Sequence, residues 1–300
     1  IGAGTGSFSI NLYNRLLNDL SCNFPSIEET KNHIIKNMLY MVEIYPEHIK
    51  ILEKTFGKEA NIIKKDFLAI NNYEYEPFDF IIGNPPYNIN GSIKTPTNYN
   101  IKKTDDGKTV YVDFVKKSLD ILYIGGYLNI IIPSLWLKPD KAELYNILTS
   151  RNIIKLHTLS ASATNKLFNY KAQTPTTFFL IENNVINPKC LNEGIYLYNN
   201  NPIISIYDKY FKKYIDYSLK YNFPIPTHGI SIINKLLTYV EKYNYLNVYK
   251  SNSPSKKTII INLKNENFCY KNIKSCILNN NNQELVINYS NIPQHYYNIP

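Results

Sequence analysis

Up to about residue 184, segments with helical periodicity alternate with short apolar segments. Apolar residues are spaced as on one helix face in four segments: 9–20, 46–56, 110–124 and 140–150. Short apolar runs typical of strands separate or follow them: 38–44, 61–67, 78–83, 125–133, 152–159 and 174–183. This alternation is typical of βαβ units, and it predicts an α/β protein with a mainly parallel sheet.

The alternation ends near residue 184. Beyond it tyrosine and asparagine become frequent, and segment 228–243 is the one stretch that reads clearly as a helix. We therefore expect a boundary near Val185, with one domain over residues 1–184 and a separate region over 185–300.

Charge and composition limit the classes of protein to consider. With 33 Lys and Arg against 24 Asp and Glu, the 300 residues carry a formal net charge of +9, which favours a polyanionic partner. No apolar run reaches the roughly 18 residues of a membrane span. The four cysteines form no CxxC pair, so neither a zinc site nor a disulfide framework is indicated. We expect a cytoplasmic protein without a membrane partner.

Three glycines alternate near the start of the chain, at Gly2, Gly4 and Gly6. They precede the predicted helix 9–20, where missing side chains would let the backbone approach a ligand closely. Their spacing departs from GxGxxG, so a dinucleotide is not implied, and a structural turn is the alternative interpretation.

Acidic residues end the next two predicted strands. Glu43, followed by Ile44, could accept hydrogen bonds from both hydroxyls of a ribose. Asp66, followed by Phe67, places an acceptor beside an aromatic ring, which suits an adenine. Either acid alone could be a solvated strand end. Their succession after the glycine turn favours a binding site along one edge of the sheet.

Asn84 follows the strand 78–83 and is itself followed by Pro85, Pro86 and Tyr87. Proline cannot donate to a sheet ladder and restricts the preceding residue to extended geometry, so the strand must end at Gly83. Asn84 is then a fixed amide at the carboxyl end of a strand, where open α/β sheets bind ligands. A simple turn is the alternative.

Six stretches resemble, in order and spacing, the adenine-specific DNA methyltransferases of restriction-modification systems: "GAGTGSF", "NMLYMVEIYPEHI", "KKDFLAI", "IIGNPPYN", "YVDFVKKSLDILYIGGYLNIIIPSLWL" and "LFNYKAQTPTTFFLIEN". The resemblance is to members with the glycine motif ahead of NPPY and the target recognition region last. It implies a Rossmann-like seven-stranded sheet that binds S-adenosylmethionine at its strand ends. Residues 1–184 would be the catalytic domain, with its first strand upstream of Ile1, and 185–300 part of the target-recognition domain. Double-stranded DNA and a fused or separate restriction nuclease are the implied partners.

The resemblance also implies roles for the motif residues. The cofactor would be held by Gly2, Gly4, Gly6, Glu43, Ile44, Asp66 and Phe67. The amide oxygen of Asn84 and the carbonyl oxygen of Pro85, held rigid by Pro86, would accept the two protons of the adenine amino group. Tyr87 would stack on an adenine flipped out of the duplex. No metal and no covalent intermediate are required.

By the same resemblance Phe168 would contact the flipped base from another side, with core packing as the alternative. Pro133 and Ser134 end a further strand and could line the same cleft. The five histidines show no metal-ligand spacing, and we interpret them as structural or surface residues: His33, His48, His157, His228 and His295.

Other functions remain open from the sequence. NPPY also occurs in methyltransferases of release-factor glutamine, where the same acceptors hold a side-chain amide. An RNA methyltransferase and a non-catalytic DNA-binding fragment are further alternatives. The polar stretch 89–108, which we expect to be a loop beside Asn84, and the C-terminal region fit a DNA enzyme better.

Overall fold

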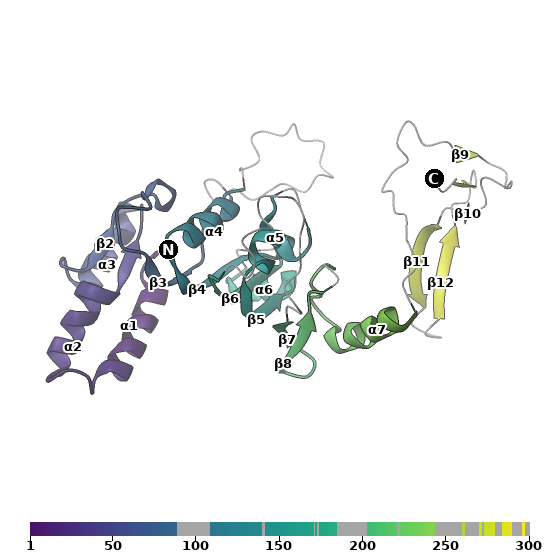
Figure 1. Cartoon of the computed structure of the whole chain (residues 1–300). Coiled ribbons are helices and arrows are strands. Elements are labelled where there is room, and N and C mark those ends of the chain that lie inside the picture. Colours follow the sequence, from purple (N-terminus) through teal and green to yellow (C-terminus); the bar gives the residue numbers. More distant parts are fainter. Residues whose placement is uncertain are drawn as a thin grey trace, which may run out of the picture. The chain divides into compact units, whose positions relative to one another are not determined.

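The computed structural model describes the backbone of the following residues: 1–88, 109–139, 142–170, 172, 174–184, 203–220, 223–243, 260–261, 270–271, 273–279, 284–289 and 296–297. They belong to two compact units, Ile1–Lys242 and Tyr243–Pro300, coloured purple to green and yellow in Figure 1. The first unit therefore extends beyond Val185. The predicted division of function at that residue stays a prediction.

The first unit contains a six-stranded mixed sheet in the order β3-β4-β6-β5-β7-β8. Its strands are β3 (Phe78–Gly83), β4 (Leu122–Pro133), β5 (Asn152–Leu159), β6 (Thr176–Glu182), β7 (Ile203–Asp208) and β8 (Lys213–Ser218). Strands β3, β4, β5 and β7 run in one direction, and β6 and β8 run against them. This confirms the predicted α/β fold class, but the sheet is mixed and not mainly parallel, because β6 and β8 pair antiparallel with their neighbours.

A parallel pair, β1 (Tyr40–Val42) and β2 (Asn61–Ile63), is joined to this sheet through residues 1–3. The backbone nitrogen of Ile1 lies 2.7 Å from the carbonyl oxygen of Ile82, and the N–H of Ala3 donates to the carbonyl oxygen of Val42 at 2.9 Å. Residues 1–3 therefore lie between β3 and β1. Residues 1–3 are not themselves a strand, so the parallel pair and the six-stranded sheet are separate sheets bridged by this segment, and the implied single seven-stranded sheet is not formed by the described residues.

Helices at the N-terminal end pack around β1. Helix α1 (Ser7–Leu20) and helix α3 (Pro46–Phe56) share a small core with the π-helix Ile34–Met38, which continues helix α2 (Ile27–His33). Proline at the first position of α3 suits a helix start, because its missing N–H would be unbonded there. The side-chain amide of Asn61 donates to the carbonyl oxygens of Ile35 and Lys36, which ties β2 to the π-helix.

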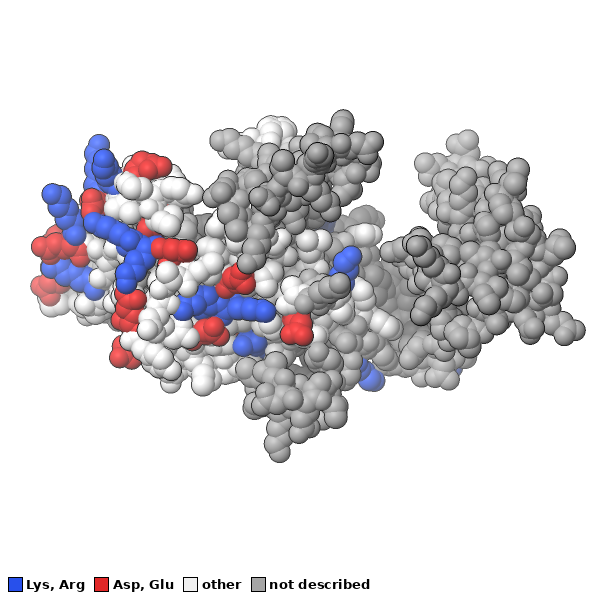
Figure 2. Space-filling model, turned by 90° about the horizontal axis from the view of Figure 1, so that it is seen from above, with Lys and Arg blue, Asp and Glu red and all other residues white. Residues whose placement is uncertain are grey.

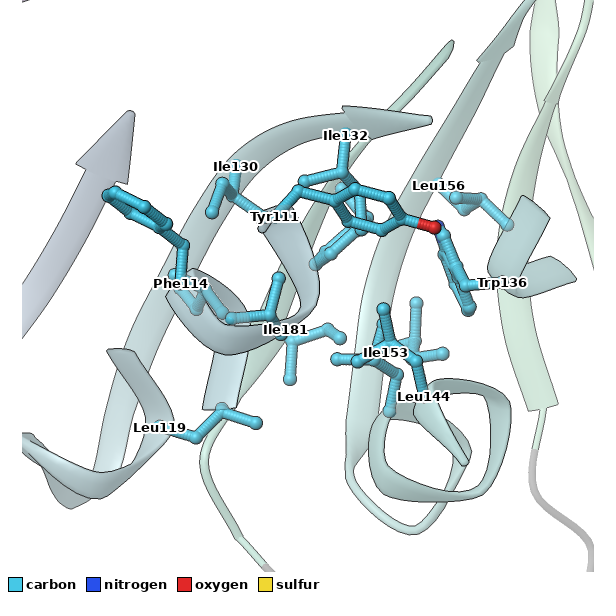
Figure 3. Close-up of a cluster of buried hydrophobic side chains, with 14 of the residues drawn as sticks. Tyr111, Phe114, Leu119, Ile130, Ile132, Trp136, Leu144, Ile153, Leu156 and Ile181 are labelled. Atoms are coloured by element: carbon cyan, nitrogen blue, oxygen red, sulfur yellow. The ribbon is translucent and has the colours of Figure 1, made fainter. Parts of the chain in front are cut away.

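The larger core lies on one face of the six-stranded sheet. Helix α4 (Tyr111–Asp120), the 3₁₀-helix Ser134–Leu137 and helix α5 (Leu144–Thr149) contribute to it, as Figure 3 shows. Alternate residues of β4 are fully buried there: Leu128, Ile130 and Ile132. Trp136 is also fully buried, and its indole N–H donates to the hydroxyl of Thr177 at 2.8 Å.

Two further helices are described: α6 (Ala161–Leu167), in the first unit, and α7 (Ile230–Tyr243), whose last residue is the first of the second unit. The second unit contains, among its described residues, the antiparallel pair of β11 (Ile273–Asn279) and β12 (Glu284–Tyr289). A three-stranded antiparallel sheet is formed by β9 (Ile260–Ile261), β13 (Tyr296–Tyr297) and β10 (Tyr270–Lys271).

Asn183, directly after β6, joins three separate chain segments. Its side-chain amide donates to the carbonyl oxygens of Leu119 and Leu122, both at 3.2 Å. Its amide oxygen accepts the Nε–H of Arg151 at 2.9 Å. The residue is 8% exposed, so these polar groups have little access to water.

We expect Asn183→Leu to lower the free energy of unfolding by about 2–4 kcal/mol, because it removes the Asn183 partner of two buried carbonyl groups and of the Nε–H of Arg151. Urea unfolding followed by circular dichroism measures the change. Asn184→Ala is the matched control, since its side chain bonds locally to Glu182. Equal effects of the two substitutions would contradict a bridging role for Asn183.

Candidate active site

The glycine turn lies at the carboxyl end of the strand position occupied by residues 1–3. Gly2, Gly4 and Gly6 have φ values of 60°, 55° and 94°, in the left-handed region that favours glycine. A Cβ added to Gly6 would lie 3.0 Å from a methyl carbon of Leu52, whereas one added to Gly4 would meet no atom within 4 Å. Gly6 therefore allows α1 to pack on α3, and Gly4 borders open space.

Glu43 follows β1 and is bonded to this turn. Its Oε2 accepts the N–H of Gly4 at 2.7 Å, and its Oε1 accepts those of Ile44 and Tyr45 at 2.9 and 3.0 Å. The carboxylate is 5% exposed, while the side chain of Ile44 is 54% exposed. The structure thus brings together the glycine turn and the first acidic strand end.

Asp66 and Phe67 occupy different environments. Asp66 is exposed, and its Oδ1 accepts the N–H of Leu68 at 3.0 Å, which caps a short 3₁₀-helix. Phe67 is 3% exposed and stacks on Phe114, with ring centroids 5.4 Å apart. One face of the Phe67 ring is therefore already used in the core. The predicted contacts of both residues with a cofactor stay predictions.

Asn84 lies directly after β3, next to the glycine turn. A Cβ on Gly2 would be 3.8 Å from the carbonyl oxygen of Asn84. The side-chain Oδ1 of Asn84 is buried and has no hydrogen-bond partner in the structure as described. Buried polar atoms are almost always bonded, so this free acceptor indicates that a ligand donates to it. Pro85 is buried and Pro86 is exposed.

Tyr87 packs against the core next to Asn84. Its ring meets that of Tyr111 edge to face, with centroids 6.4 Å apart, and its hydroxyl is buried without a partner in the part of the chain that is described. Burial raises the pKa of the Tyr87 hydroxyl to about 12, so the group is neutral at physiological pH. A bridge between Asn88 and Thr109 follows, and the expected loop 89–108 lies outside the described residues.

Ser134 and Phe168 lie at the same edge of the sheet. The N–H of Ser134, directly after β4, donates to the carbonyl oxygen of Pro175 at 2.9 Å, and its hydroxyl oxygen is buried without a partner in the described segments. Phe168 follows α6, which is fixed to β6 by a 2.9 Å hydrogen bond between the hydroxyls of Thr164 and Thr176. The contact of Phe168 with a base stays a prediction.

Two residues of the site are not identified by the sequence patterns. A Cβ on Gly83 would lie 2.5 Å from the carbonyl oxygen of Ile1, so only glycine allows residues 1–3 to pair with β3. His48, interpreted above as structural, lies in the first turn of α3 with its Nδ1 3.7 Å from Oε1 of Glu43. Its place just after a strand that ends in an acidic residue is the signal that could have identified it.

An apolar pocket lies between β1 and β3, beside residues 1–3. Met41, Phe80 and Leu12 are among its lining residues. Gly4, Glu43 and Asn84 do not line it, so we do not assign it to the ligand of the polar strand ends.

The described part of the chain shows neither a metal-binding cluster nor a membrane-spanning helix. The described side chains contain no group of three His, Cys, Asp or Glu residues arranged to hold a metal ion. None of the helices within the described ranges has the length and apolarity needed to span a bilayer.

One comparison with known proteins identifies a family for this chain. A family model described as Eco57I restriction-modification methylase matches residues 9–168. A search of curated proteins found no match.

Three of the solved structures similar to this chain come from restriction-modification enzymes. The Type I restriction enzyme EcoKI M protein is 16% identical, with a TM-score of 0.45, over 60% of this chain and 38% of that one. A type I methyltransferase subunit from Streptococcus thermophilus is 16% identical, with a TM-score of 0.38, over 69% and 42%. A nuclease-deletion mutant of the Type ISP enzyme LlaGI is 14% identical, with a TM-score of 0.48, over 90% and 26%. This chain thus spans less than half the length of each.

Proposed function

This chain belongs to the Eco57I restriction-modification methylase family, and we propose that it transfers a methyl group from S-adenosylmethionine to the exocyclic amino group of adenine in DNA. The observation that carries the proposal is the buried side-chain Oδ1 of Asn84, which accepts no hydrogen bond from the described residues, in a residue whose backbone lies beside the glycine turn. Family membership supports a methylase, and the free acceptor supports an amino group as its target.

The residues around the glycine turn fit S-adenosylmethionine. Gly4 borders open space, Glu43 keeps one unused acceptor position on Oε2, and the apolar side chain of Ile44 is exposed beside them. These residues would hold the nucleoside part of the cofactor. When bound, the cofactor supplies an electrophilic methyl group on a sulfonium sulfur.

Asn84 and Pro85 would prepare the amino group for reaction. The lone pair of an adenine amino group is delocalised into the ring, which makes its nitrogen a poor nucleophile. Two fixed acceptors, the Oδ1 of Asn84 and the carbonyl oxygen of Pro85, would bind both amino protons and favour a nitrogen whose lone pair is localised. The prolines hold these acceptors in place, because a displacement of about 1 Å can lower the rate roughly a hundredfold.

Tyr87 and Phe168 would bind the flipped base. A base within the duplex cannot present its amino group to a pocket, so the adenine must leave the stack. Tyr87 follows the acceptors directly, and Phe168 approaches the same edge of the sheet from α6. Aromatic faces at these two places would offset the free energy of extrusion.

We expect Tyr87→Ala and Phe168→Ala each to lower methylation of matched duplex by roughly tenfold to a hundredfold, as expected for loss of stacking on one base. Both losses should shrink on DNA with a mismatched target adenine, because extrusion is then easier by a few kcal/mol. Methylation rates on the two substrates measure this. Tyr73→Ala, at a 95% exposed tyrosine, is the control. Equal losses on both substrates together with a lowered melting temperature would mark either residue as core packing.

Charge supports DNA as the partner, although its distribution is uneven. Lys and Arg alternate with Asp and Glu over the described part of the face in Figure 2. Residues 243–300 instead contain six Lys against two Glu, a net charge of +4 of the total +9. This supports placing part of the target recognition in the C-terminal region. A restriction nuclease, fused or separate, and a cytoplasmic location complete the proposal.

Nucleoside analysis of DNA incubated with the full chain and S-adenosylmethionine tests the proposed function. We expect N6-methyladenine as the modified nucleoside. Methylated cytosine, methylated RNA, or methylated protein glutamine with unmodified DNA would overturn the substrate assignment.

A further inference from the structure

The carboxylate of Glu43 has little free hydrogen-bonding capacity. A carboxylate offers about four acceptor positions, two on each oxygen. Oε1 already accepts the N–H groups of Ile44 and Tyr45, and Oε2 accepts that of Gly4. One position remains, on Oε2, whereas a ribose presents two neighbouring hydroxyl groups. The second hydroxyl therefore needs another partner.

His48 carries an unused polar atom beside this carboxylate. Its Nδ1 is buried, and none of the described residues forms a hydrogen bond with it. The 3.7 Å separation from Oε1 of Glu43 is too long for a hydrogen bond, and Oε1 already has two donors. A buried polar atom without a partner is unfavourable. The unbonded Nδ1 of His48 therefore indicates a hydrogen-bond partner from outside the described residues.

The imidazole is held in place while remaining accessible. His48 lies in the first turn of α3, which begins at Pro46, and its ring meets the ring of Tyr45 edge to face at 5.6 Å between centroids. The side chain is 35% exposed. A ligand bound at Glu43 can therefore contact the exposed part of the ring, and rotation of the ring, without rearrangement of the helix, turns the buried Nδ1 toward that ligand.

We propose that His48 is a cofactor-binding residue whose Nδ1 accepts a hydrogen bond from one ribose hydroxyl while Oε2 of Glu43 accepts one from the other. The inference rests on the proposed use of S-adenosylmethionine and adds a residue to its site. It assigns a ligand contact to a histidine that the sequence alone led us to interpret as a structural or surface residue.

The test measures binding of S-adenosylhomocysteine and of its 2′-deoxy and 3′-deoxy analogues by calorimetry, with the full chain. We expect His48→Ala to weaken S-adenosylhomocysteine roughly threefold to tenfold, as for loss of one neutral hydrogen bond. One of the two deoxy analogues should bind wild type and His48→Ala equally, since it lacks the hydroxyl that Nδ1 accepts. His48→Asn should restore part of the affinity, because its amide oxygen lies close to the place of Nδ1.

His228→Ala, at an exposed histidine bonded to its neighbour Thr227, is the matched control and should leave all three affinities unchanged. Equal weakening of all three ligands by His48→Ala, without rescue by His48→Asn, would show a structural role and overturn the inference. Unchanged affinities would overturn it as well. Failure of the wild-type chain to bind any of the three ligands would instead overturn the cofactor assignment, and this inference with it.

Discussion

Replacing Asn84 by alanine is expected to lower the rate of methyl transfer by roughly 100- to 1,000-fold, the effect typical of removing one preorganised polar group from a reacting centre. Affinity for S-adenosylhomocysteine should change by less than about threefold, because in our proposal Glu43 and the glycine turn, and not Asn84, hold the nucleoside. Single-turnover methylation and calorimetry measure the two quantities separately.

Two further variants distinguish the role of the Asn84 amide as a hydrogen-bond acceptor from its role in ending β3. Asn84→Gln keeps the amide but moves it by about one methylene, and it should lose about as much rate as a 1 Å displacement does, roughly a hundredfold. Asn71→Ala, at an exposed turn asparagine, is the control. An Asn84→Ala protein that keeps most of its turnover would show that the amide serves only to end β3.

The fold class follows from the sequence because each central strand is marked by a short apolar run. Strands β3 to β6 contain Ile- and Leu-rich segments that alternate with helices, so their existence could be predicted. The direction of β6 could not, since periodicity describes faces of a strand and not its orientation. Its antiparallel pairing with β4 and β5 is visible only in the structure.

Short elements, and elements within segments of biased composition, could not be predicted from the sequence for physical reasons. Helices α2 and α6 have seven residues each, less than two full turns, which is too short to show a periodic apolar face. Strand β7 places Ile204 and Ile206 in the core, but its surroundings are rich in Tyr and Asn. The predicted helix 110–124 ends at Asp120 instead, because Leu122 pairs with Phe78 at the start of β4.

The candidate site likewise contains residues that the sequence predicts and contacts that only the structure reveals. Asn84 could be identified from covalent chemistry alone, since two prolines fix where the strand must end. Glu43 could be placed at a strand end by its position. The three backbone donors on its carboxylate, and the Nδ1 of His48 that the described residues leave unbonded, depend on contacts between β1, α3 and the glycine turn, which no linear pattern encodes.

Glu43→Gln is expected to raise the dissociation constant of S-adenosylhomocysteine by roughly 10- to 150-fold, the range for loss of a hydrogen bond to a charged group. The substitution removes the negative charge, and it also replaces one oxygen by an NH2 group. All three positions now bonded to the carboxylate are N–H donors, so that NH2 group must face at least one of them. Either the glycine turn, at Gly4, or the backbone of Ile44 and Tyr45 should therefore be displaced as well.

The loss of affinity should be specific to Glu43, the acidic residue that is bonded to the glycine turn. Glu47→Gln, four residues further on at an exposed position in the first turn of α3, provides the matched control and should change the dissociation constant by less than about twofold. Calorimetry gives the affinities, and thermal melting without ligand shows how far the turn itself is destabilised. If both variants bound S-adenosylhomocysteine as tightly as the wild type, Glu43 would serve only to order the backbone of Gly4, Ile44 and Tyr45. The ribose would then have to be held elsewhere.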